Sequence, residues 1–70
     1  MNYIQKLVEI RKEKNISQSD IAKILNTTQQ QVSKYENGKQ EMPIRHLITI
    51  AKELNISIDY LVGLNNEKKN

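Results

Sequence analysis

Residues 17–38 read SQSDIAKILNTTQQQVSKYENG, and this stretch decides the fold. Ser17 and Asp20 have the spacing of a capping box, in which a hydroxyl residue and an acid three places later each accept the other's backbone N–H. Thr28 and Gln31 stand at the same spacing. Each pair opens a segment with apolar residues at helical intervals, so the stretch predicts two consecutive short helices.

The same stretch predicts where both helices end and how they are joined. Asn26 tolerates the left-handed backbone conformation that ends many helices, and Gly38 adopts it freely. Only about three residues, 26–28, connect the helices, and so short a connection forces the sharp crossing of a helix-turn-helix unit. Apolar residues at helical spacing mark the inward faces of the two helices: Ile21, Ala22, Leu25, Val32 and Tyr35.

Three more helices are predicted outside this unit, over residues 2–14, 43–54 and 57–63. Each is followed or closed by a residue typical of helix ends: Asn15, Asn55 and Gly63. Pro43 and Ser57 suit helix starts. The predicted fold class is therefore all-α, a compact bundle of five short helices. We expect one domain over residues 1–64, followed by a polar C-terminal tail over 65–70.

The composition excludes several classes of protein. The chain has 70 residues and no cysteine, so neither a disulfide nor a cysteine metal site is available. The single histidine, His46, lacks the partners of a four-ligand zinc site or of a catalytic pair, and we expect it on a helix surface. We therefore expect no enzyme activity, no catalytic residue, no metal, no cofactor and no small-molecule substrate.

Hydropathy indicates where in the cell the protein is located, and charge indicates what class of partner it binds. No apolar run approaches the ~18 residues of a membrane span, and the N-terminal residues lack the pattern of a signal peptide. We therefore expect a cytoplasmic protein without a membrane partner. The net charge of +3 and the isoelectric point near 9.3 suit nucleic-acid binding, although many unrelated small domains are as basic.

The second helix of the central unit carries the candidate binding surface. At 100° per residue, the side opposite Val32 and Tyr35 gathers polar residues without an acid among them: Gln29, Gln30, Ser33, Lys34 and Asn37. Glutamine can bond adenine N6 and N7 in a bidentate way, and lysine can donate to guanine O6 and N7. A solvated helix face has a similar composition, and the short connection before this helix favours the recognition role.

The order and spacing of three sequence blocks resemble the XRE family (Cro/C1 type), the DNA-binding domains of temperate-phage repressors and many bacterial regulators. These blocks are Ser17-Gln18, Tyr35-Glu36-Asn37-Gly38 and Ile56-Ser57-Ile58-Asp59-Tyr60-Leu61. The similarity runs from about Leu7 to Leu64. It implies a lambda-repressor-like DNA-binding domain.

The resemblance also implies roles for individual residues. Residues matching or adjoining base-contacting positions are Gln29, Gln30, Ser33 and Lys34. Residues expected at the phosphate backbone are Gln18, Thr28, Gln31, Asn37, Lys39 and Arg45. Arg11 and Glu36 match a buried ion pair that ties the first helix to the end of the third.

These observations lead to one expected function and one alternative. We expect a sequence-specific regulator of transcription, a repressor, that binds a double-stranded DNA operator as a homodimer. The dimer contact is expected where the fourth and fifth helices end, with Ile58 as a contributor that could equally belong to the core. The alternative is a protein-interaction module of the same fold, such as an antitoxin, in which DNA binding is secondary.

Overall fold

The computed structural model describes residues 3–62, which form five α-helices and no strand. The helices are α1 (Tyr3–Glu13), α2 (Gln18–Leu25), α3 (Gln29–Glu36), α4 (Ile44–Leu54) and α5 (Ile58–Leu61). The predicted all-α bundle is therefore confirmed. The expected roles of Asn2 at the start of α1 and Gly63 at the end of α5, and the tail over 65–70, lie outside the described residues.

Four of the helices end in the same left-handed turn, as their sequences predicted. The residues with positive φ are Asn15 (58°), Asn26 (57°), Asn55 (56°) and Gly38 (74°). After each, the next N–H donates to the carbonyl five residues earlier, as in Thr27 to Ala22 at 2.9 Å. This is the Schellman pattern, which satisfies carbonyls that the helix leaves free.

The two predicted capping boxes differ in the structure. At α2 the box is complete: Asp20 N donates to Ser17 Oγ at 3.0 Å, and Ser17 N donates to Asp20 Oδ2 at 3.1 Å. The backbone N–H and then the hydroxyl of Ser17 lower the pKa of Asp20. At α3 only one of the two hydrogen bonds of the capping box forms. Gln31 N donates to Thr28 Oγ1, but the Gln31 side chain donates to Gln40 Oε1 in the following loop.

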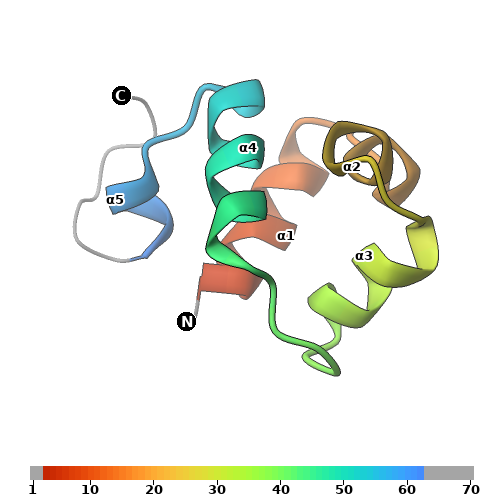
Figure 1. Ribbon diagram of the computed structural model, residues 1–70. Helices are drawn as coiled ribbons and strands as arrows, with labels where there is room; N and C mark the ends of the chain where they lie inside the picture. The colour runs from red at the N-terminus through yellow and green to blue at the C-terminus, as the bar shows by residue number, and fades with distance from the viewer. Residues whose placement is uncertain (1–2, 63–70) are drawn as a thin grey trace.

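The core lies where α2 packs against both α3 and α4, while α5 closes the other end against α1 and α4 (Figure 1). Its most deeply buried side chains come from four helices: Ile21, Val32, Leu47, Ile50 and Leu61. Met42, in the loop between α3 and α4, is also buried and had no sequence signal, because it belongs to no helical pattern. The core thus fixes the crossing of α2 and α3.

The left-handed residue in the α2–α3 connection gives a test of the turn. Asn26→Ala should lower the free energy of unfolding by about 1 kcal/mol, because a left-handed alanine brings its Cβ close to the following carbonyl oxygen. Asn26→Gly should be at least as stable as the parent by this criterion. Urea denaturation measures both. Asn37→Ala is the matched control, since Asn37 ends α3 at φ −90°, and an equal loss there would contradict the assignment.

Candidate nucleic-acid interface

The exposed side of α3 is a polar surface without an acidic side chain. Gln29, Gln30 and Lys34 are exposed and Ser33 is half-buried, while Val32 and Tyr35 anchor the opposite side in the core. The helix therefore presents two amides, a hydroxyl and an ammonium group together. These groups can donate and accept hydrogen bonds at the edges of bases.

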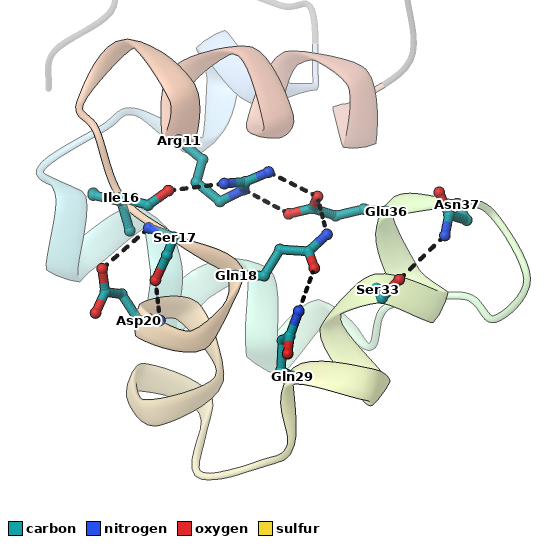
Figure 2. A network of polar contacts seen from close by, with 9 residues as sticks. All are labelled: Arg11, Ile16, Ser17, Gln18, Asp20, Gln29, Ser33, Glu36 and Asn37. Carbon is teal, nitrogen blue, oxygen red and sulfur yellow. Dashed lines mark hydrogen bonds and ion pairs between the residues drawn. The ribbon is translucent and has the colours of Figure 1, made fainter.

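The residues expected at phosphates surround this surface rather than forming one cluster. Thr28 lies at its N-terminal end and Asn37 and Lys39 follow its C-terminal end, all exposed. Asn37 donates to Ser33 Oγ at 3.2 Å (Figure 2). Gln31, half-buried, is held by Gln40. Arg45 is exposed in the first turn of α4.

Behind this surface, Arg11 of α1 and Glu36 of α3 form a largely buried ion pair. Arg11 Nε donates to Glu36 Oε2 at 2.8 Å and Arg11 Nη2 donates to Oε1 at 3.1 Å. The two side chains are only 11% and 9% exposed. Arg11 Nη1 also donates to the carbonyl of Ile16 at 2.8 Å. One guanidinium thus holds α1, the α1–α2 connection and the end of α3 together.

Hydrogen bonds of Gln18 and Gln29 connect this ion pair to the molecular surface. Sequence reasoning did not predict these two hydrogen bonds. Gln18 Nε2 donates to Glu36 Oε1 at 2.9 Å, and Gln29 Nε2 donates to Gln18 Oε1 at 3.1 Å (Figure 2). Gln18 was expected to face a phosphate, but in the structure most of its amide is bonded within the protein. No pattern within a single helix could have predicted this contact, because Gln18 lies on α2 and Gln29 lies on α3.

His46 lies beside the core residue Tyr35 and belongs to no metal site in the described part of the chain. His46 is half-buried, and its ring lies 5.9 Å from that of Tyr35. Burial, and then the charge of Arg45, lowers the pKa of His46. Within residues 3–62, no group of three or more histidine or acidic side chains could hold a metal ion.

A helix-turn-helix family model matches residues 7–61, which include all five helices except the first residues of α1. The chain belongs to the Cro/C1-type helix-turn-helix family. The match covers the α2–α3 unit and the Arg11–Glu36 pair, and it confirms the resemblance found in the sequence. In this family of DNA-binding regulators, the exposed surface of α3 is the candidate nucleic-acid interface.

Two curated proteins illustrate the similarity. The uncharacterized HTH-type transcriptional regulator YqaE of Bacillus subtilis (strain 168) is 36% identical over 67 residues, covering 94% of this chain and 58% of that protein. An uncharacterized HTH-type transcriptional regulator of Rickettsia prowazekii (strain Madrid E) is 34% identical over 56 residues, covering 80% of this chain and 43% of that protein. The chain thus spans about half the length of these relatives.

No solved structure gives a significant match. Among the described helices, none is long and apolar enough to cross a membrane. Because no solved structure matches, the family assignment rests on the sequence match and on the helical arrangement.

The ion pair gives a test of how α3 is held. Glu36→Ala should lower the free energy of unfolding by about 3 kcal/mol or more, because it strands the buried charge of Arg11. Glu53→Ala, at an exposed position of α4, is the matched control and should stay within about 0.5 kcal/mol of the parent. Thermal unfolding monitored by circular dichroism compares them. Equal melting temperatures for the two variants would refute a stabilising role for the pair.

Proposed function

We propose that this protein is a sequence-specific regulator of transcription, acting as a repressor, that reads the major groove of double-stranded DNA with α3. The observation that carries the proposal is the acid-free, exposed side of α3, held by a short turn from α2 and by the Arg11–Glu36 pair. A helix so held can enter the major groove while its partner helix crosses the backbone.

The proposed interface separates into two groups by chemistry. Gln29, Gln30, Ser33 and Lys34 project from α3 and are assigned to base edges, which distinguish one base pair from another. The residues at the helix ends and on α4 are assigned to phosphates, which position the protein and add affinity for any sequence: Gln18, Thr28, Gln31, Asn37, Lys39 and Arg45.

We further propose that two copies bind one operator, since a single recognition helix reads only a few base pairs. Ile58 is a weaker candidate for the dimer contact than the sequence suggested, because it packs partly against the core. Ile44 and Val62 remain 62% and 43% exposed and line one surface hollow with Pro43. Pro43 lies at the end of the loop that connects α3 to α4. A second copy bound at this hollow would therefore hold the two α3 helices at a fixed distance from each other.

The first test separates specificity from affinity, using an operator found by selection of bound DNA. Gln30→Ala should reduce discrimination at one base pair per half-site by about 1–3 kcal/mol and leave the salt dependence nearly unchanged. Lys39→Ala should weaken all sequences and lower the salt slope by about one unit per monomer. Titrations of single-base operator variants at several salt concentrations measure both. If Gln30→Ala weakened binding to every operator variant equally, the alternative function as a protein-interaction module would be favoured.

The second test concerns stoichiometry. Ile44→Asn, a neutral change that does not repel DNA, should weaken cooperative occupancy of the two half-sites while leaving binding to a single half-site intact. Thr49→Asn is the control, because it is also a neutral change and five residues along α4 place it about 140° from Ile44 around that helix. Analytical ultracentrifugation of protein–operator mixtures gives the number of chains bound. One chain per operator at saturating parent protein contradicts the homodimer.

A further inference from the structure

The loop that connects α3 to α4, residues 37–43, is fixed to the helices at both ends (Figure 1). Where it begins, the backbone N–H groups of Lys39 and Gln40 both donate to the carbonyl of Lys34, at 2.9 and 3.3 Å. Where it ends, the side chain of Met42 is buried in the core. The part of the loop before Met42 is exposed, and it contains Lys39, which is assigned to a phosphate.

A hydrogen bond between two glutamine side chains fixes the loop at a third point. Gln31 Nε2 donates to Gln40 Oε1 at 2.9 Å, across nine positions of sequence. Gln31 lies in the first turn of α3, and Lys34 lies about one turn later. Gln40 is therefore bonded to two successive turns of α3, by its side chain at Gln31 and by its backbone at Lys34. The loop is held along the helix instead of extending away from it.

The course of the loop keeps its lysine and its acid apart. Glu41 lines the surface hollow with Tyr3 of α1 and Ile44 of α4, whereas Lys39 follows the C-terminal end of α3. The phosphates of DNA attract a lysine and repel a carboxylate. A loop that was free to change its course could bring Glu41 toward a phosphate as easily as Lys39. The bond between the two glutamines opposes such a change.

We propose that Gln31 and Gln40 are positioning residues for the phosphate contact of Lys39, a proposal that rests on the proposed function. A loop that is already ordered in the free protein loses less conformational entropy when it binds. Because a phosphate carries no sequence information, the gain in affinity is the same for every operator. In this role Gln31 supports a phosphate contact of the loop instead of making one itself.

A direct phosphate contact of Gln31 predicts a different pattern of losses. Such a contact depends on Gln31 alone, whereas the proposed role depends equally on Gln40, which is not among the residues assigned to DNA. Two residues that act through one shared bond have effects that are not additive. Removing the second glutamine after the first should therefore cause no further loss.

The test measures the operator affinity of Gln31→Met, Gln40→Met and the double variant, because methionine keeps the length of the side chain and removes the amide. Each single variant should weaken binding to all operator variants by one common factor, roughly threefold to tenfold, the equivalent of one hydrogen bond. The double variant should bind no more weakly than either single variant. The salt slope should keep its parent value, because Lys39 still reaches its phosphate. When Lys39→Ala is already present, Gln40→Met should have no further effect.

Gln5→Met is the matched control, the same change at an exposed position of α1, and it should leave operator affinity unchanged. Three results overturn the proposal: a loss in Gln31→Met without one in Gln40→Met, which assigns Gln31 to a phosphate; additive losses in the double variant; and a loss in Gln40→Met that persists when Lys39 is absent. If the parent protein selects no DNA sequence, the proposed function fails as well, and this outcome is recognised without any variant.

Discussion

The bidentate contact between Arg11 and Glu36 is the constraint on which the rest of the structure depends. It joins residues 25 positions apart, the last turn of α1 and the final residue of α3. Removing two charges from water is costly, so a buried pair persists only where its geometry is good and its other donors have partners. Here the carbonyl of Ile16 takes a further donor of Arg11. Any tilt of α3 relative to α1 would therefore weaken several charged hydrogen bonds together.

The helix ends, together with the ion pair, determine how the helices are placed relative to one another. A left-handed residue follows each of the first four helices. After α1, α2 and α4 the next helix begins within a few residues, whereas a longer loop follows α3. Ile16 and Ile56, directly after two of these residues, return toward the core. Asn26 has the same role in the α2–α3 connection, where the angle between the two helices determines how far α3 stands out. The orientation of the exposed side of α3 thus follows from local backbone conformation and from the core together.

Residues that stabilise the fold and residues of the candidate interface belong to one hydrogen-bonded network in this domain. Glu36 accepts from Arg11 and from Gln18, and Gln18 accepts from exposed Gln29. A domain of this size has few buried polar groups, and within residues 3–62 every buried side-chain nitrogen or oxygen has a partner. A polar side chain that enters such an interior must join a bonded network, because an unsatisfied buried group is costly. The network therefore extends outward until it reaches the surface.

The sequence by itself determined the helices, their caps, most of the core and the family, because these depend on spacing along one chain segment. Ser17, Asn26 and Gly38 act within their own helix ends, so their roles are visible in the order of residues. The family resemblance also supplied the pairing of Arg11 with Glu36. Only the tertiary structure decided the half-formed box at Thr28, the burial of Met42 and the bonding of Gln18. In each case the deciding partner lies on another element. The Gln31 side chain bonds to Gln40 instead of completing its capping box, and the core encloses Met42 although it lies in a loop. Glu36 and Gln29 both bond to Gln18 because α2 and α3 cross there.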